Sequence, residues 1–197
     1  MKDVTKNEIK VLLTILKNPE TSYNASNIAK EIGISSMGAL KILKRLEREN
    51  LLYSKQLGRS IFYDFNFKNE YLIEYLTFLL NKEIEQACPY TKRWVRELKK
   101  IKNSELIILF GSVLEEEKNA TDVDVLFIIN PKKIQLLKTE IEKINMVNDK
   151  RIHPIYQSER DFKDNIRNQD KIVLNALKGI TLVGQRKFVD FLKEVHK

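Results

Sequence analysis

The sequence predicts an α+β protein built from two parts. Three amphipathic segments and a hairpin pattern fill the first part, whereas short apolar runs separated by helical patterns begin at Glu105. A chain of 197 residues can form one large domain or two small ones. The change of pattern favours two, at 1–66 and 104–197. Helices at 67–103 are expected to connect the domains or to pair subunits.

The first two helices are short and have clear end signals. Apolar side chains recur at helical spacing over 5–17, and Asn18-Pro19 predicts the end of that helix. Ser26 is a suitable N-cap for a second helix over 27–32, which Gly33 would end. We therefore expect two consecutive helices before residue 34.

A third, longer helix and a hairpin complete the first part. Ser35 or Ser36 would cap the helix, which extends to about Asn50 and turns its apolar side chains inward. Residues 51–56 and 60–66 are rich in Tyr, Phe and Ile and flank Gly58, which predicts a β-hairpin with glycine at its turn. The expected order is helix, helix, helix, hairpin.

The remaining chain changes from helices to a sheet pattern. Apolar spacing predicts helices over 71–85 and 91–101. Three short apolar runs follow, at 105–110, 122–129 and 151–156. A periodic segment at 132–147 lies before the last run, which is typical of a sheet covered by helices. The tail from Glu159 is expected to be mainly helical.

Composition excludes several classes of protein. No apolar run approaches the roughly 20 residues that cross a bilayer, and the N-terminus lacks the apolar stretch of a signal peptide. We therefore expect a cytoplasmic protein without a membrane partner. The single cysteine, Cys88, excludes an internal disulfide, and one Cys with two His does not make a structural zinc site.

The positive charge of the chain is concentrated in one region. The chain carries 35 Lys and Arg against 27 Asp and Glu, a formal net charge of +8. Residues 35–63 hold six basic side chains and only two acidic ones. This density favours an anionic partner, although an excess of charge also serves solubility. The third helix and the hairpin are therefore the candidate binding region.

Three helices and a hairpin, with positive charge on the last helix and the hairpin, resemble the winged helix-turn-helix family of DNA-binding domains. The resemblance covers about residues 5–66 and implies double-stranded DNA as the partner, with the third helix in the major groove. It implies DNA contacts from Ser35, Ser36, Met37, Lys41, Lys44, Arg45, Arg48, Lys55 and Arg59. Arg59, beside the turn, would reach toward an adjacent minor groove. Alternatively, the cations are ordinary solvated positions.

A second pattern lies in the sheet part. One apolar run ends at Gly111-Ser112, and Asp122-Val123-Asp124 opens the next. Alternate residues of a strand point to one side, so Asp122 and Asp124 would present two carboxylates together. Adjacent carboxylates favour a divalent cation such as Mg²⁺ or Mn²⁺. Gly111 lets the backbone approach a phosphate, and Ser112 adds a hydroxyl and N–H groups.

This pattern resembles the DNA polymerase beta-like nucleotidyltransferase superfamily, especially its minimal nucleotidyltransferases. The likeness extends over roughly 94–157 and implies an α/β domain with a short mixed sheet and C-terminal helices. It also implies that Gly111 and Ser112 hold the triphosphate of an NTP, while Asp122 and Asp124 are catalytic and hold Mg²⁺ or Mn²⁺. The reaction would be transfer of a nucleoside monophosphate to a hydroxyl.

Two features depart from that family. Relatives supply a third carboxylate from a later strand, but residues 151–156 contain no acid. His153 in that run is either a plain strand residue or part of the site, and imidazole suits Mn²⁺ better than Mg²⁺. The loop after Ser112 carries Glu115, Glu116 and Glu117, whose charge opposes an anionic substrate.

Two functions agree with these patterns, and a third possibility is a structural module whose helices over 71–85 assemble subunits. The first is a DNA-binding transcriptional regulator whose second domain binds nucleotide and divalent metal. The alternative is an active nucleotidyltransferase that moves NMP from an NTP to a protein or small-molecule hydroxyl. The missing third acid favours the first. In either case we expect a homodimer, because winged helices gain specificity by reading paired half-sites.

Overall fold

The computed structural model describes residues 4–114 and 121–195, and the chain divides into two compact units. The N-terminal unit runs to Leu79 and takes in the chain from Leu192, and the sheet unit runs from Leu80 to Phe191. Helices and a hairpin in the first unit and a sheet in the second confirm the predicted α+β class. In the part of the chain that the structure describes, no helix is long and apolar enough to cross a bilayer.

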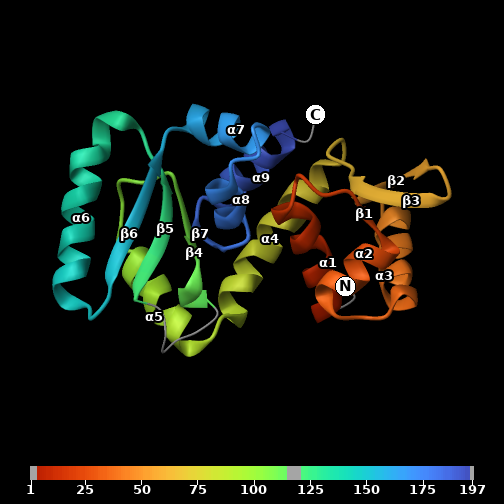
Figure 1. The fold of residues 1–197 in the computed structure, drawn as a ribbon, viewed down its shortest axis with the longest axis horizontal. Coiled ribbons are helices and arrows are strands. Elements are labelled where there is room, and N and C mark those ends of the chain that lie inside the picture. The colour runs from red at the N-terminus through yellow and green to blue at the C-terminus, as the bar shows by residue number, and fades with distance from the viewer. Residues whose placement is uncertain (1–3, 115–120, 196–197) are drawn as a thin grey trace. The chain divides into compact units, whose positions relative to one another are not determined.

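The N-terminal unit has the predicted order of elements (Figure 1). Its helices are α1 (Lys6–Lys17), α2 (Ala25–Ile32) and α3 (Ser36–Arg48), and its hairpin strands are β2 (Leu52–Leu57) and β3 (Ser60–Phe65). A further strand, β1 (Tyr23–Asn24), pairs antiparallel with β3 and gives the sheet the order β1-β3-β2. The sequence did not predict β1, because two residues are too few for an alternating pattern.

The start of α2 differs from the prediction. Asn24, not Ser26, is the N-cap: its side chain accepts hydrogen bonds from the backbone N–H groups of Ser26 at 2.9 Å and Asn27 at 3.0 Å. The Asn27 side chain in turn accepts from the Asn24 N–H at 2.7 Å, completing a capping box. Ser26 was a chemically suitable cap, but the pairing of β1 with β3 places Asn24 at the helix start.

The apolar faces of the three helices meet in one core. The side chains of Leu12, Leu16, Ile28, Leu43 and Leu46 are fully buried. They come from all three helices, and Leu52 closes the core from the hairpin. Burial of each such side chain contributes about 1.5–3 kcal/mol. This core fixes the orientation of α3, whose other side therefore faces solvent.

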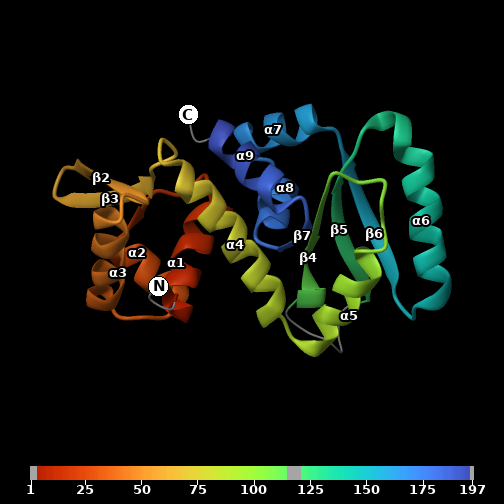
Figure 2. The same cartoon turned by 180° about the vertical axis from the view of Figure 1, so that it is seen from behind.

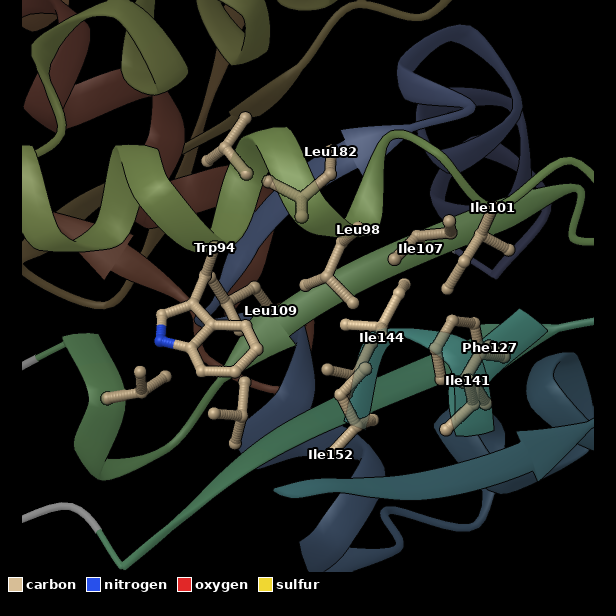
Figure 3. Packing of buried hydrophobic residues seen from close by; sticks show 14 of the residues in the cluster. Trp94, Leu98, Ile101, Ile107, Leu109, Phe127, Ile141, Ile144, Ile152 and Leu182 are labelled. Carbon is tan, nitrogen blue, oxygen red and sulfur yellow. The ribbon is translucent and has the colours of Figure 1, made fainter. Parts of the chain in front are cut away.

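Helices α4 (Glu70–Gln86) and α5 (Pro89–Leu98) occupy the segment predicted as a connector. The boundary between the units falls within α4, after Leu79. Trp94 and Leu98 of α5 are buried in the core of the sheet unit (Figure 3). Thus α5 is an integral part of that unit, while a role of residues 67–103 in pairing subunits stays a prediction.

The sheet unit is built on a mixed four-stranded sheet. Its strands are β4 (Leu106–Phe110), β5 (Asp122–Ile128), β6 (Arg151–Gln157) and β7 (Ile180–Val183), in the order β6-β5-β4-β7. Strands β5 and β6 are parallel, whereas β4 is antiparallel to both β5 and β7. The first three strands were predicted; the short β7 was not, since four residues between glycines also suit a loop.

Helices cover both faces of this sheet. Residues 107, 109, 123, 125 and 127 pack with α5 and with α6 (Ile134–Val147) in one hydrophobic cluster (Figure 3). The even-numbered side chains of β5 point to the opposite face. Helices α7 (Glu159–Arg167), α8 (Lys171–Leu177) and α9 (Gln185–Val195) follow; α7 contacts β6 and α8 contacts β4. Figure 2 shows the elements from behind, with α6 beside β6.

Candidate functional site

The outer face of α3 carries a stripe of exposed side chains. These side chains are Met37, Lys41, Lys44 and Arg48. Their spacing of four, three and four residues aligns them along one side of the helix. The buried residues of α3 lie on the opposite side and are Ala39, Leu43 and Leu46. The core of the unit therefore turns three predicted DNA-contacting cations toward solvent.

The cations of this stripe are not paired with acids. Over residues 4–114 and 121–195, Lys41, Lys44 and Arg48 form no salt bridge, and the only hydrogen bond assigned among them joins Arg48 Nε to the Lys44 carbonyl at 3.4 Å. Their positive charge is consequently available to an external anion. Unpaired cations on one helix face attract anionic groups such as phosphates.

Ser35 and Ser36 lie at the start of α3. The Ser35 hydroxyl is the N-cap and accepts a hydrogen bond from the Gly38 N–H at 3.1 Å. Ser36 is the first helical residue and is exposed. The cap fixes where the helix begins, so Ser35 has a structural role. It is also exposed to solvent.

Arg45 differs from the other cations of α3 because it has partners inside the N-terminal unit. Its guanidinium pairs with the carboxylate of Glu8, whose side chain is only 5% exposed. The Tyr75 hydroxyl donates to the other carboxylate oxygen of Glu8 at 3.0 Å. Burial, together with the Glu8 charge, raises the pKa of Tyr75 above its ordinary 10.0, so the phenol remains a donor. Arg45 thus ties α3 to α1, while its contact with DNA stays a prediction.

The hairpin presents its basic residues at an exposed tip. Strand residues Leu57 and Ser60 pair across a two-residue turn made of Gly58 and Arg59. Gly58 has φ 61°, the positive value that the first residue of such a turn often requires. Arg59 and Lys55 are exposed, and their contact with DNA stays a prediction. Two exposed apolar side chains, Leu57 and Ile61, flank the tip.

The sheet unit brings the two predicted aspartates together. Asp122 and Asp124 are partly exposed on one face of β5, while Val123 between them is fully buried. The parallel register sets His153 of β6 directly beside Asp124. His153 Nδ1 lies 3.0 Å from Asp124 Oδ1, and ligand atoms of all three residues lie within 4.8 Å of one another. The donor set of two carboxylates and one imidazole fits a divalent metal ion.

The sequence left the position of His153 open because a parallel register cannot be inferred from spacing. Strands β5 and β6 are joined through α6, and the packing of that crossover sets which residues face each other. Alternation alone predicts that Asp122 and Asp124 share a face. It does not say that an imidazole completes the cluster.

Gly111 is fitted closely against Asp124. It follows β4 with φ 79°, and a Cβ added there would lie 2.3 Å from Asp124 Oδ2. Both its backbone conformation and the space around it therefore require glycine. Ser112 is exposed and begins a short 3₁₀ helix, η1 (Ser112–Leu114). The predicted Gly-Ser pair thus lies beside the carboxylates, while Glu115, Glu116 and Glu117 lie outside the described residues.

The acids nearest to β6 are engaged elsewhere. Asp149 pairs with Arg93 at 3.2 Å, and Asp161 accepts from the Ser158 hydroxyl at 2.6 Å in the cap of α7. Glu159 pairs with Lys163 at 3.0 Å and Lys187 at 3.1 Å, and the hydrogen bond from Lys163 lowers the pKa of Glu159. Within the described residues, the cluster that could hold a metal ion is Asp122, Asp124 and His153.

Comparison with known proteins identifies the class of the first unit. Residues 5–53 match the family model described as winged helix-turn-helix DNA-binding. The N-terminal unit is therefore a winged helix-turn-helix domain of the DNA-binding type, in agreement with its helices and hairpin. The match ends at Tyr53, so it says nothing of the sheet unit.

Solved structures with lower similarity were also found. A double mutant of ZitR from Lactococcus lactis has 16% identity and a TM-score of 0.32, covering 50% of this chain and 73% of that one. The transcriptional regulator Tm0710 from Thermotoga maritima has 19% identity and a TM-score of 0.31, covering 49% of this chain and 72% of that one. No curated protein matches the chain.

Proposed function

We propose that this protein is a DNA-binding transcriptional regulator. The observation that carries the proposal is the stripe of exposed, unpaired cations on α3, at Lys41, Lys44 and Arg48. An α-helix fits the major groove, and Lys and Arg on its outer side neutralise phosphates and contact base edges. The matched family supports the same conclusion for residues 5–53.

Each part of the domain has a separate task in this proposal. The stripe on α3 enters the major groove, with Met37 and Ser36 near its N-terminal end. Arg59 at the hairpin tip reaches an adjacent minor groove, where a narrow groove attracts a guanidinium. The flanking Leu57 and Ile61 suit the apolar sugar walls of that groove.

Fluorescence anisotropy with labelled duplex DNA over a salt series tests the proposal. The triple variant Lys41→Ala/Lys44→Ala/Arg48→Ala is expected to bind at least tenfold more weakly and to flatten the salt dependence, since each lost phosphate contact removes about 0.9 from the slope. A matched control removes the same charge from three exposed lysines near α6, as Lys133→Ala/Lys138→Ala/Lys143→Ala. No binding of wild-type protein at low salt would reject the proposal.

We further propose that the regulator is a homodimer, which would read two half-sites. Tyr71 and Phe78 on α4 are 60% and 42% exposed and lie seven residues apart, hence on one side of the helix. This is a surface that subunit pairing would bury. Analytical ultracentrifugation at micromolar concentration is expected to give the mass of two chains, and a monomer there would reject the dimer.

The second candidate function is nucleotidyl transfer in the sheet unit. It is favoured by the close fit of Gly111 against Asp124 and by the two carboxylates on one face of β5. Backbone N–H groups at Gly111 and Ser112 would hold the triphosphate of an NTP. Asp122 and Asp124 would hold Mg²⁺ or Mn²⁺, which on binding would align an acceptor hydroxyl with the α-phosphate and stabilise pyrophosphate. The acceptor would be a protein or a small molecule.

Incubation with labelled ATP, CTP, GTP or UTP and Mg²⁺ or Mn²⁺ tests this activity. Transfer of label by the wild type that is lost in Asp122→Asn/Asp124→Asn would support an enzyme. The control Asp149→Asn removes a nearby acid that pairs with Arg93 and should keep the activity. If no nucleotide labels any acceptor with either ion, the second candidate is rejected and the regulator stands without it.

A further inference from the structure

We infer that His153 is the third ligand of the metal site and that the site binds a first-row transition ion, such as Mn²⁺, in preference to Mg²⁺. The inference rests on the metal site proposed above at Asp122 and Asp124. It adds a residue from another strand and a class of ion.

The sheet holds the three side chains on one face. Asp124 and His153 are direct partners in the parallel pairing of β5 with β6, and Ile152 beside His153 packs in the hydrophobic cluster on the other face. Val123 is fully buried in the same cluster. Val123 and Ile152 point into that core, and successive side chains of a strand point to opposite faces. Asp122, Asp124 and His153 therefore point to the other face of the sheet.

The separation of Asp124 and His153 matches a shared ion. Two adjacent ligands of an octahedral ion with bonds of about 2.1 Å lie about 3.0 Å apart. The observed distance from His153 Nδ1 to Asp124 Oδ1 is 3.0 Å. Ligand atoms of Asp122, Asp124 and His153 all lie within 4.8 Å of one another, so Asp122 is close enough to share the ion.

The site is open enough to keep further ligand positions. The side chain of His153 is 65% exposed and that of Asp124 is 27% exposed. An ion held by three protein atoms on an open sheet face retains positions for water or for phosphate oxygens. The alternative is a plain hydrogen bond in which Asp124 orients the imidazole and no ion binds through nitrogen.

The imidazole determines which ions are preferred. Mg²⁺ is a hard ion that takes oxygen ligands almost exclusively, whereas imidazole nitrogen suits the first-row transition ions. A third carboxylate would have given a site of three negative charges, and His153 leaves two. The smaller negative charge weakens the attraction for Mg²⁺. The nitrogen donor maintains the affinity for Mn²⁺ and for the later first-row transition ions.

Titration of the full-length protein with Mn²⁺, followed by electron paramagnetic resonance, tests the inference, with Mg²⁺ as competitor. We expect wild-type protein to bind Mn²⁺ at least tenfold more tightly than Mg²⁺. Electron spin echo modulation should show coupling to a directly bound ¹⁴N. His153→Ala should weaken Mn²⁺ binding roughly tenfold or more and abolish that coupling, and His153→Asp should shift the preference toward Mg²⁺. Circular dichroism confirms that each variant is folded.

The outcomes separate this inference from the proposals on which it depends. If no Mn²⁺ binds, or if Asp122→Asn/Asp124→Asn binds it unchanged, the proposed metal site is wrong and the inference falls with it. If Mn²⁺ needs the aspartates but shows no ¹⁴N coupling and binds His153→Ala equally well, the metal site stands and the role of His153 is wrong. Neither result depends on catalysis or on DNA binding.

Discussion

Glu8 of α1 and Arg45 of α3 form an ion pair in the N-terminal unit, 37 residues apart in the chain. The Glu8 side chain is buried, and Tyr75 donates a second hydrogen bond to it. The pair therefore holds the proposed DNA-reading helix against α1 from its inner side. The exposed cations of α3, Lys41, Lys44 and Arg48, remain accessible to an external partner.

Breaking this pair should destabilise the protein. Arg45→Ala leaves the buried carboxylate of Glu8 without its cation, which typically costs about 3–5 kcal/mol when one partner of a buried pair is removed. The residual bond from Tyr75 places the expected loss near the lower end, about 3 kcal/mol. Urea denaturation of the full chain measures it. Arg48→Ala on the same helix is exposed and should stay within about 0.5 kcal/mol of the wild type; equal losses for the two variants would contradict the assignment.

The wing arginine should affect DNA binding without affecting stability. Arg59 lies at the exposed tip of the hairpin, and the described residues offer it no acidic partner. Arg59→Ala should reduce the salt slope of duplex binding by about 0.9 and leave the urea midpoint unchanged. A slope equal to that of the wild type would remove the wing from the proposed interface. Arg59→Lys keeps the charge and should keep the slope.

Gly111 should tolerate no side chain. Gly111→Ala places a methyl group against the Asp124 carboxylate and adds the strain of a positive φ, about 1–2 kcal/mol for a residue with a Cβ. We therefore expect lower thermal stability together with loss of Mn²⁺ affinity. The control Gly33→Ala has φ 74° with nothing within 4 Å, so it shares the strain but not the collision. Unchanged Mn²⁺ affinity in Gly111→Ala would count against the site.

Glu159 should contribute to the pH dependence of stability. The hydrogen bond from Lys163, and then the one from Lys187, lower the pKa of Glu159 below its ordinary 4.5. A carboxyl with a lower pKa in the folded state stabilises the protein above pH 4.5, and this contribution is lost as the pH falls through the folded value. The thermal midpoints of wild type and Glu159→Gln should therefore differ at pH 7 and converge as the pH falls well below 4.5. The exposed Glu142→Gln serves as a control, and a difference that grows in acid would contradict the assignment.

The sequence predicted the elements that carry a long periodic signal. Helices α1 and α3 and strands β4, β5 and β6 lie within one or two residues of their predicted ranges, because their apolar spacing is set by the core that they form. Strand β1 and the N-cap of α2 were missed for one reason. Tyr23 and Asn24 are placed by pairing with Tyr63 and Phe62 of β3, which lie 40 and 38 residues further along the chain. Local pattern carries no information on such pairing.

The candidate sites were predictable to a similar extent. Alternation placed Asp122 and Asp124 together, and the amphipathic pattern of α3 placed its cations outside. Two facts lay beyond the sequence. Arg45 pairs with Glu8 because the fold buries that acid beside it. His153 lies next to Asp124 because of the register of β6 against β5, and these strands are joined through α6. Both arise from tertiary packing between segments far apart in the chain.

Among the described residues, the order β6-β5-β4-β7 makes β6 an outer strand that pairs with β5 alone. Backbone bonds at the margin of a sheet open more readily than those within it. Asp124 and His153 therefore lie on neighbouring strands, and His153 is on the one at the margin of the sheet. A metal ion bound by both side chains would close a loop of chain that contains α6. Occupancy of the site would therefore oppose local opening of β6.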